Sequence, residues 1–342
     1  MVFLCSEVLA DYMALKLTSY YRGSNVPSDL PGTDVFHSTT LFHIYASTSG
    51  FNPVLVVATD GGVVLGKLLA VVQKIWRISP LFALRRGMAF GTGEYFCQPE
   101  QRAEIFNAML LEVTRYVNRL GAAVMEFRNL NRALDGFGQL KNNGYFAVNW
   151  MSVRNDLTAV TNIEDVMSKS RLRQLRKGLR NGAQVAEALS EDDVRAFARM
   201  LKENYRHKLQ HHLPNAEFFH QIVQRMSADG DSKIFITKFR GKVIGGCVCL
   251  YSGSNKAYVW FSGAMNKTYL RQYPGILCVW KALTDAKERG YEELEFMDVG
   301  LPFRKHGYRE FVLRFGGTQM GTRRWFRIRW GWLNSICRKL YS

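Results

Sequence analysis

The sequence has no cysteine pattern that is typical of a disulfide framework or a zinc site. Its six cysteines include no CxxC pair and lie mostly in apolar segments, at positions 5, 97, 247, 249, 278 and 337. Cysteines of this kind are expected to be reduced, buried thiols. A metal site is not expected, because no HExxH motif is present either.

Long hydrophobic runs and a leader segment are missing as well. No stretch reaches the roughly 18 consecutive apolar residues that a membrane-spanning helix needs. The first residues, MVFLCSEVLADY, lack a basic start and include Glu7 and Asp11, so they make a poor signal peptide. We therefore expect a cytoplasmic protein, with attachment to the membrane surface as an additional property.

Acidic residues are scarce relative to basic ones. The chain has 29 Asp and Glu against 46 Lys and Arg, and its formal net charge is +17. This excess favours an anionic partner or substrate, such as nucleic acid, a phospholipid surface, a CoA or acyl-carrier-protein donor, or a tRNA. With 342 residues and 47% hydrophobic content, the chain is long enough for about two domains with cores of their own.

A series of elements occurs twice in the same order. Residues 54–72 and 233–253 each contain two β-rich runs around a glycine-containing turn, which predicts a hairpin. Helical patterns follow at 102–121 and 275–290, and each stops at a glycine before a strand-like segment. Each copy then reaches a Gly-Tyr pair, which leads into another strand. The offset of about 160 to 180 residues indicates an internal repeat, although any α/β chain alternates such elements.

The two copies meet near residues 156–165, where DLTAVTNIED predicts a turn and then a helix start. No low-complexity linker separates them, so the halves are expected to pack together. We place an N-terminal domain at residues 1–158 and a C-terminal domain at residues 159–342.

This order resembles the GNAT acyltransferase fold, in which a hairpin precedes a central strand, a helix that receives the donor's pyrophosphate, and a further strand. Two copies, with RLRQLRKGLRNG opening the second, resemble the FemA/FemB-type aminoacyltransferases and GNAT proteins with a BioF2-like acetyltransferase domain. The matching segments, strongest over 160–320, are SRLRQLRKGLRNGAQV, ENYRHKLQHHLPNAEFFHQIV, KVIGGCVCLYSGSNKAYVWFSGA, YPGILCVWKALTDAKERGYEELEFMDVG and GYREFVLRFGG. The resemblance implies an α/β (α+β) chain of two tandem GNAT-like domains, each a mixed central sheet flanked by helices.

The resemblance also implies an activity. The chain is expected to be an N-acyltransferase that moves an acyl group from an acyl thioester, on CoA or acyl carrier protein, to an amine. It would hold no permanently bound cofactor. Two alternatives stay open: a tRNA-dependent aminoacyltransferase that acts on a peptidoglycan precursor, and a non-catalytic anion- or nucleic-acid-binding protein of the same fold.

The stretch KSRLRQLRKGLRNGA, residues 169–183, contains six basic residues and no acid. On a helix with about 100° per residue, five of them fall within an arc of roughly 100°, beside a leucine stripe. The five are Lys169, Arg173, Arg176, Lys177 and Arg180, and the leucines are Leu172, Leu175 and Leu179. Because clustered like charges repel, we interpret the arc as a face that binds an anionic donor. A merely solvated basic face is the alternative.

A second candidate phosphate site is RQYPGILCVWKAL, residues 271–283. The family resemblance places the donor's pyrophosphate at the start of this helix, where Arg271, Gln272 and Gly275 lie. The segment lacks the full Arg/Gln-x-x-Gly-x-Gly/Ala pattern of GNAT enzymes. An ordinary helix start with Pro274 in its first turn is the alternative.

The resemblance further assigns roles in the reaction. In GNAT enzymes the strand that corresponds to KAYVWFSGA donates a backbone N–H to the acyl carbonyl, so the main chain at Trp260 and Phe261 is the oxyanion candidate. Asp298 would deprotonate or orient the amine, or else cap a turn. Tyr308 or His306 would protonate the leaving group, although Tyr308 is equally a core aromatic of the repeat.

Two further regions carry candidate contacts. Tyr205 and His207, in ENYRHKLQHHLPNAEFF, match a cleft segment of the related proteins, and Tyr273 borders the same cleft, so all three are candidate substrate-binding residues. A hydrated surface helix is the alternative for the histidine-rich segment. The tail RRWFRIRWGWLNSICRKLY predicts an amphipathic strand followed by a short helix, and its mixture of basic and aromatic residues suits an anionic membrane surface.

Overall fold

The computed structural model describes residues 15–77, 83–130, 134–205, 213–253 and 255–341. The strands are β1 (Lys16–Tyr21), β2 (Phe51–Asp60), β3 (Val63–Arg77), β4 (Ala83–Phe90), β5 (Glu94–Tyr95), β6 (Val124–Arg128), β7 (Phe146–Asp156), β8 (Gln184–Glu187), β9 (Ser232–Phe239), β10 (Lys242–Ser252), β11 (Lys256–Ala264), β12 (Glu293–Phe296) and β13 (Thr318–Ile328). The α-helices are α1 (Thr39–Ser47), α2 (Arg102–Arg119), α3 (Phe137–Asn142), α4 (Ile163–Val166), α5 (Lys169–Arg180), α6 (Glu191–Asn204), α7 (Ala216–Gln221), α8 (Pro274–Glu288), α9 (Gly307–Leu313) and α10 (Gly331–Tyr341). A 3-10 helix, η1 (Val35–His37), and a π-helix, η3 (Ile222–Ser227), complete the described elements.

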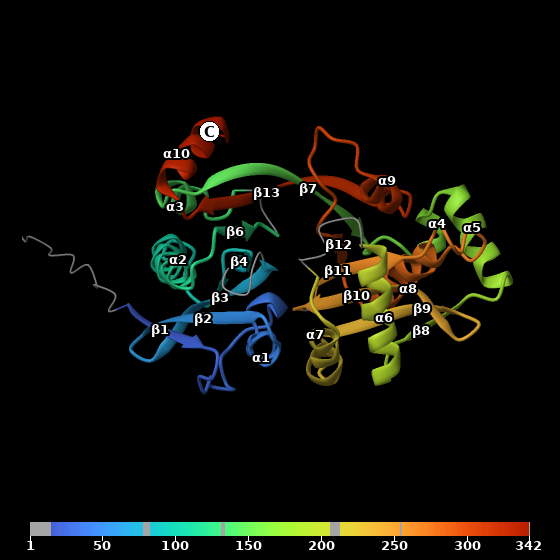
Figure 1. Cartoon of the computed structure of the whole chain (residues 1–342), viewed down its shortest axis with the longest axis horizontal. Coiled ribbons are helices and arrows are strands. Elements are labelled where there is room, and N and C mark those ends of the chain that lie inside the picture. The colour runs from blue at the N-terminus through green and yellow to red at the C-terminus, as the bar shows by residue number, and fades with distance from the viewer. Residues whose placement is uncertain (1–14, 78–82, 131–133, 206–212, 254, 342) are drawn as a thin grey trace, which may run out of the picture.

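One mixed sheet contains all of these strands. Its order is β1-β2-β3-β4-β6-β13-β7-β12-β11-β10-β9-β8, and β5 pairs with β3 beside this path. The pairs β4–β6 and β11–β12 are parallel, and the other pairs are antiparallel. Helices flank the sheet (Figure 1). The predicted α/β fold class is therefore confirmed.

The two halves of the chain follow the same order of elements. The strand series β1-β2-β3-β4-β6 and β8-β9-β10-β11-β12 each end in a parallel pair, and α2 and α8 occupy the same place before the last strand. Both hairpins turn where the sequence predicts, with positive φ at Gly61 (53°) and Gly241 (76°). A duplication, and a domain boundary between residues 158 and 159, stay predictions.

The halves exchange their last strands. Strand β7 of the first half pairs with β12 of the second, while β13 of the second half lies between β6 and β7. Figure 1 shows β7 and β13 running across the molecule from one half to the other. Residues far apart in the sequence, such as Arg128 and Arg324, are direct partners in this pairing.

A shared core joins the two halves, as the missing linker predicts. Tyr45 and Phe51 of the first half and Phe218 of the second belong to one buried cluster. The Phe218 ring centroid lies 5.8 Å from that of Tyr45 and 5.5 Å from that of Phe51. Stacked aromatic rings at such distances add to the stability that burial alone provides.

The leucine stripe of α5 differs from the prediction. Leu175 is fully buried and Leu172 is partly buried, but Leu179 is 42% exposed. Gly178 takes the buried position instead, because a Cβ there would lie only 2.6 Å from the carbonyl oxygen of Gln272. The helix thus packs closely against the loop before α8, and Leu179 turns toward solvent.

The two Gly-Tyr pairs are not equivalent, contrary to the repeat as read from the sequence. Tyr145 follows α3 and enters β7, whereas Tyr308 begins α9 and precedes β13. Tyr308 thus lies in the first turn of its helix, whereas Tyr145 lies beyond the end of its helix. The Tyr145 hydroxyl is buried and lies 2.7 Å from that of Thr114. The hydroxyls of Tyr145 and Tyr308 therefore occupy different places in the two halves.

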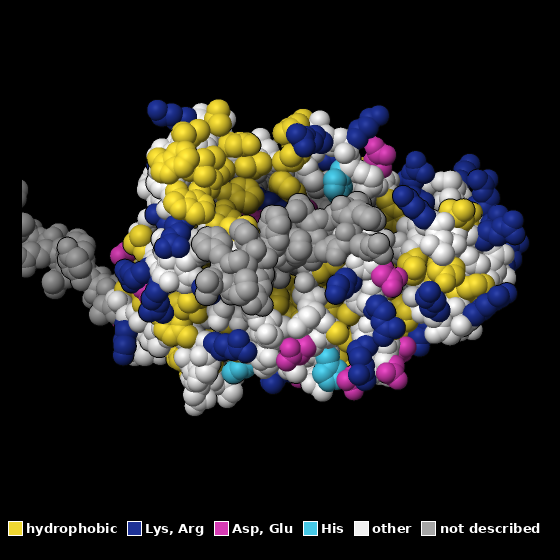
Figure 2. Space-filling view, viewed as in Figure 1, with side chains coloured by type: hydrophobic (Ala, Val, Ile, Leu, Met, Phe, Trp, Pro, Cys, Tyr) yellow, Lys and Arg dark blue, Asp and Glu magenta, His cyan; other side chains and the backbone are white. Residues whose placement is uncertain are grey.

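The tail folds as predicted into a strand, β13, followed by a short helix, α10. Apolar side chains of α10 and of the residue before it are exposed, at 48% for Trp330, 69% for Trp332, 49% for Ile336, 73% for Leu340 and 53% for Tyr341. Figure 2 shows this hydrophobic patch where α10 lies. Among the described residues, no helix is both long and apolar enough to cross a membrane.

Candidate active site

The main cavity has a volume of about 820 Å³ and lies between the two halves. The second half contributes mainly β11, the start of α8 and the segment from β12 to α9, together with residues of α7 and β13. The first half contributes residues of α1, β2, β3, β4, β6 and β7. Several residues proposed from the sequence line it, namely Tyr205, Trp260, Phe261, Gly275, Asp298, His306 and Tyr308.

Strand β11 changes its pairing at the cavity. Its parallel pairing with β12 ends at Val259, and its register with β10 shifts there, because Val248 pairs with Phe261 while Cys249 pairs with Val259. Trp260 is thus the extra residue of a β-bulge, a feature that re-aims the chain beside functional sites. This backbone arrangement makes the main chain at Trp260 and Phe261 a candidate for contact with an acyl carbonyl.

Two tyrosines converge on Ser262 at the same place. The Tyr205 hydroxyl donates to the Ser262 carbonyl oxygen at 2.8 Å, and the Ser262 hydroxyl donates to the Tyr308 oxygen at 2.9 Å. The Tyr308 proton therefore remains for another acceptor. Burial raises the pKa of Tyr308 strongly, against the opposing hydrogen bond from Ser262. Tyr308 accordingly stays protonated and acts as a hydrogen-bond donor rather than as a ready proton source.

Asp298 lies at the cavity in an ion pair. Its Oδ1 is 3.1 Å from Nη2 of Arg324, and its side chain is 57% exposed. Desolvation by the cavity walls would raise the pKa of Asp298, but the positive charges of Arg324 and Arg128 outweigh it and lower that pKa. The carboxylate is thus ionised near neutral pH and is a weak base, which suits orienting an ammonium group better than deprotonating it.

Three arginines form one wall of the cavity, which we call the arginine wall: Arg86 of β4, Arg128 of β6 and Arg324 of β13. Glu126 of β6, only 2% exposed, pairs with all three of them. The shortest of these contacts joins Oε1 of Glu126 to Nε of Arg128 at 2.8 Å. Arg324 also lies over the Trp150 ring, 3.9 Å from its centroid. Burial and the neighbouring Arg128 lower the pKa of Arg324 to about 10, despite its acidic partners.

The two candidate phosphate sites lie against each other. The Asn181 side-chain amide, at the end of α5, donates to the Arg271 carbonyl oxygen at 2.7 Å. Gly178 packs on Gln272, as described above, and Tyr273 adopts the left-handed conformation (φ 47°) just before α8. A non-glycine residue rarely adopts this conformation, which often marks functional segments. In the first turn of α8, Pro274 has no N–H, the Gly275 N–H donates to Oδ1 of Asn266 at 3.4 Å, and the N–H groups of Ile276 and Leu277 donate to the Tyr273 carbonyl oxygen.

The basic side chains themselves lie outside the main cavity. Lys169, Arg173, Arg176, Lys177 and Arg180 are exposed and do not line it, and neither do Arg271, Gln272 and Tyr273. Arg176 forms an ion pair with Glu164 at 3.2 Å. The roles proposed for the basic residues of α5 and for Arg271, Gln272 and Tyr273 stay predictions. A donor that contacts these residues would do so outside the main cavity. His207 lies outside the described residues.

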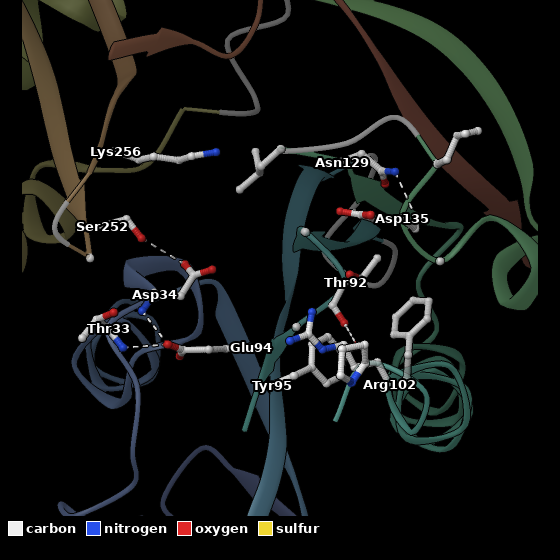
Figure 3. A pocket seen from close by; sticks show the side chains of 18 of the residues that line it. Thr33, Asp34, Thr92, Glu94, Tyr95, Arg102, Asn129, Asp135, Ser252 and Lys256 are labelled. Atoms are coloured by element: carbon white, nitrogen blue, oxygen red, sulfur yellow. Dashed lines mark hydrogen bonds between the residues drawn. The ribbon is translucent and has the colours of Figure 1, made fainter. Parts of the chain in front are cut away.

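A second cavity, of about 600 Å³, occupies the corresponding place in the first half. In Figure 3, Asp34, Glu94 and Asp135 border it together with Arg102 and Lys256. Oε1 of Glu94 accepts hydrogen bonds from two backbone N–H groups, 2.6 Å and 2.9 Å away, and its Oε2 lies 3.2 Å from the buried Lys67 ammonium. This acid-rich lining suits an anionic donor less well than the main cavity does.

The cysteines of the described segments do not form a site of their own. Cys247, Cys249 and Cys278 are buried free thiols, and burial contributes to raising the pKa of Cys278, which lines the main cavity. A thiol in such surroundings is a poor nucleophile. In the described ranges, no group of three or more His, Cys, Asp or Glu side chains is arranged to hold a metal ion.

Sequence reasoning missed the arginine wall and Glu126. A signal was present, because Glu126 and Arg128 alternate with apolar residues in AVMEFRN and so share one face of a strand. The contribution of Arg324 had no local signal, since its place beside Arg128 depends on the exchanged strand β13.

Comparison with known proteins agrees with this geometry. Residues 169–305 match the acetyltransferase (GNAT) domain family. A crystal structure of FemX is similar in fold, with a TM-score of 0.60 and 13% sequence identity, over 92% of this chain and 96% of that chain. A tandem GNAT protein from the clavulanic acid biosynthesis pathway has a TM-score of 0.53 and 11% identity, over 83% and 85% of the two chains. No curated protein sequence matches this chain.

Residues 169–305 are therefore a GNAT acyltransferase domain, set in a chain whose fold is that of FemX and of a tandem GNAT protein. The protein is an acyltransferase enzyme. This result favours the two enzymatic hypotheses from the sequence over a non-catalytic binding protein. The acyl donor and the acceptor are proposed below from the site.

Proposed function

We propose that the protein transfers an acyl group from acyl-CoA to the nitrogen of an amine in the main cavity. The observation that carries this proposal is the β11 bulge at Trp260, beside the first turn of α8, in the half that matches the GNAT family. A donor whose carbonyl lies at the bulge would place its phosphates toward the start of α8, where the helix dipole favours an anion. Acyl carrier protein is the alternative thioester donor.

The start of α8 fits a CoA pyrophosphate. Gly275 approaches β11 closely, since a Cβ there would lie 3.2 Å from the Cβ of Ala264, so the start of α8 lies directly beside the strand that carries the bulge. The helix dipole favours an anion at this end, and the Gly275 N–H is held only by a long hydrogen bond of 3.4 Å to Oδ1 of Asn266, which a phosphate oxygen would replace. Arg271 and the basic face of α5 adjoin this point and would contact the outer phosphates or the surface of a carrier protein.

The reaction needs a neutral amine, a polarised carbonyl and a stabilised leaving thiolate. The amine nitrogen forms the new bond to the carbonyl carbon, the carbon–sulfur bond breaks, and the proton that the nitrogen loses passes, directly or through water, to the departing thiolate, which leaves as the CoA thiol. Main-chain N–H groups at Trp260 and Phe261 would stabilise the oxyanion, and the Tyr308 hydroxyl would donate a hydrogen bond to the leaving sulfur. Asp298 and Tyr205 would orient the acceptor.

Acyl-CoA, acyl carrier protein and tRNA can be distinguished by titrating each against the wild type and an Arg173→Gln, Arg176→Gln double variant at two salt concentrations. We expect the variant to bind the true donor more weakly while remaining folded, because exposed charges contribute little to stability. Binding of acyl-CoA should respond weakly to salt. A tRNA held by several of these residues would instead lose affinity with a logarithmic slope of about one per phosphate neutralised.

An Arg195→Gln, Arg199→Gln variant of α6 is the matched control, because it removes two exposed arginines from another helix. It should bind the donor as the wild type does. Unchanged affinity of the α5 variant for all three molecules would reduce α5 to a solvated surface helix. A steep salt dependence with tRNA alone would select the tRNA-dependent aminoacyltransferase instead.

We also propose that α10 rests on an anionic membrane surface. Its exposed apolar side chains have exposed basic neighbours, Arg329, Arg338 and Lys339, and this combination is typical of helices that lie in the lipid interface. A Trp332→Ser, Leu340→Ser variant should bind phosphatidylglycerol vesicles at least about tenfold more weakly in co-sedimentation, given the apolar area removed. A Val63→Ser, Leu189→Ser variant, which changes exposed apolar residues elsewhere, should bind normally. Equal binding by both variants would exclude α10 as the contact.

A further inference from the structure

The arginine wall has a regular origin in the sheet. Strands β4, β6 and β13 are neighbours, with Phe90 opposite Arg128 and Arg128 opposite Arg324. Because side chains alternate between the faces of a strand, Arg86, Met88 and Phe90 share the face that borders the main cavity. The wall is thus built on three paired strands rather than on loops, which holds its charged groups in fixed positions.

The charges of this wall do not cancel. Three guanidinium groups meet two carboxylates, those of Glu126 and Asp298, which leaves one positive charge in excess. The side chains are largely buried, at 15% exposed for Arg86 and Arg128 and 8% for Arg324. An uncompensated charge in such a place costs free energy unless a counter-charge approaches it.

Two hydrogen-bond donors at the wall also lack acceptors. Nε of Arg86 and Nε1 of Trp150 are buried, and neither has a hydrogen-bond partner within the described part of the chain. Both residues line the main cavity. Buried donors are nearly always paired in folded proteins, so two such donors beside an excess positive charge indicate a missing acceptor that is negatively charged.

We propose that the arginine wall binds a carboxylate of the amine acceptor, so that the acceptor is an amino acid or a similar carboxylate-bearing amine. One carboxylate supplies one negative charge, which matches the excess, and its two oxygens suit guanidinium and indole N–H donors. A phosphate dianion would bring two negative charges, one more than the excess positive charge of the arginine wall. The binding of a carboxylate by the arginine wall does not depend on the proposed acyl transfer. Only the identification of this carboxylate as part of the acceptor rests on the proposed function.

Anion binding can be tested without any reaction. The thermal unfolding of the protein is followed with sodium acetate, with sodium chloride at the same ionic strength, and with acetamide as the uncharged match of acetate. Acetate alone should raise the Tm. In Arg86→Met the affinity for acetate should fall roughly tenfold to a hundredfold, the usual effect of losing a charged hydrogen-bonding group. Arg86→Lys keeps the charge and should retain most of the binding.

If Arg86→Met does not fold, Trp150→Phe replaces it, because it removes one donor and keeps an aromatic ring. Equal shifts with acetate and acetamide, or an acetate shift that survives both variants, would overturn the proposal. A larger shift with inorganic phosphate than with acetate would overturn the assignment to a carboxylate.

A second measurement identifies the ligand as the acceptor. With acetyl-CoA as donor, L-phenylalanine is compared with phenethylamine, which lacks only the carboxylate. The wild type should acylate phenylalanine with a kcat/KM at least tenfold higher, and Arg86→Met should lose this preference. Equal rates for the two amines would remove the acceptor role. If neither amine is acylated, the proposed reaction fails under these conditions, and the acetate titration still decides whether the wall binds a carboxylate.

Discussion

Replacement of Glu126 by glutamine is expected to lower the free energy of unfolding by about 3–5 kcal/mol, the usual result of breaking a buried ion pair from one side. Glutamine keeps the shape of the side chain but leaves the arginine wall with Asp298 as its only carboxylate. The exposed fraction of Glu126 is only 2%, so water cannot replace the lost charge. Denaturation by urea, followed by fluorescence and circular dichroism, measures the change.

The matched control is Glu164→Gln, which breaks the exposed ion pair with Arg176. Its effect should stay below about 1 kcal/mol, since surface pairs contribute little. A Glu126→Gln protein that unfolds at the same urea concentration as the wild type would show that the arginine wall does not need this carboxylate.

The same residue gives the protein a defined sensitivity to acid. Burial acts to raise the pKa of Glu126, but the arginine wall outweighs it and lowers that pKa from 4.5 to about 2. Because the folded pKa lies below the unfolded value, the contribution of Glu126 is present above about pH 4.5 and is lost as the pH falls toward 2. The wild type should lose this stability on the order of 3 kcal/mol over that range, and Glu126→Gln should not.

Replacement of Tyr308 by phenylalanine is expected to lower kcat roughly a hundredfold and to change KM little, as when one donor to a developing charge is removed. The aromatic ring and its packing remain, so only the hydrogen bond to the leaving sulfur and the contact with Ser262 are lost. Steady-state kinetics at saturating donor measure the effect.

Tyr145→Phe provides the control, since this hydroxyl is also buried and hydrogen-bonded but lies far from α9 in the fold, between α2 and the start of β7. It should leave kcat unchanged. A Tyr308→Phe enzyme with normal kcat would return Tyr308 to the alternative of a core aromatic, and the leaving thiolate would then depart without its help.

Local signals predicted the elements that they control. Glycines at Gly61 and Gly241 predicted both hairpins because positive φ is a property of single residues, and helical periodicity predicted α2, α5 and α8. The order of these elements was enough to indicate the GNAT fold. The placement of Trp260 and Asp298 in one cavity followed from that fold.

Contacts between segments that are far apart in the sequence could not be predicted from local patterns. The pairing of Arg324 with Glu126 depends on β13 crossing into the first half, and no pattern within either strand encodes that crossing. The α5 leucine stripe was misread for a related reason, because the loop that packs on Gly178 is nearly a hundred residues away in the sequence. The two Gly-Tyr pairs are a further example, because the same dipeptide follows the end of α3 in the first half and begins α9 in the second.

The exchange of β7 and β13 also determines the order in which the sheet can be completed during translation. During translation the first half emerges with one edge of β6 unpaired, because β13, its neighbour on that side, is synthesised only after β7 to β12. The same strand carries Arg324, so the arginine wall is completed only when the chain has been made as far as β13. A ribosome-bound or prematurely terminated chain would therefore carry an exposed strand edge, which is a natural target for chaperones, and no finished catalytic centre.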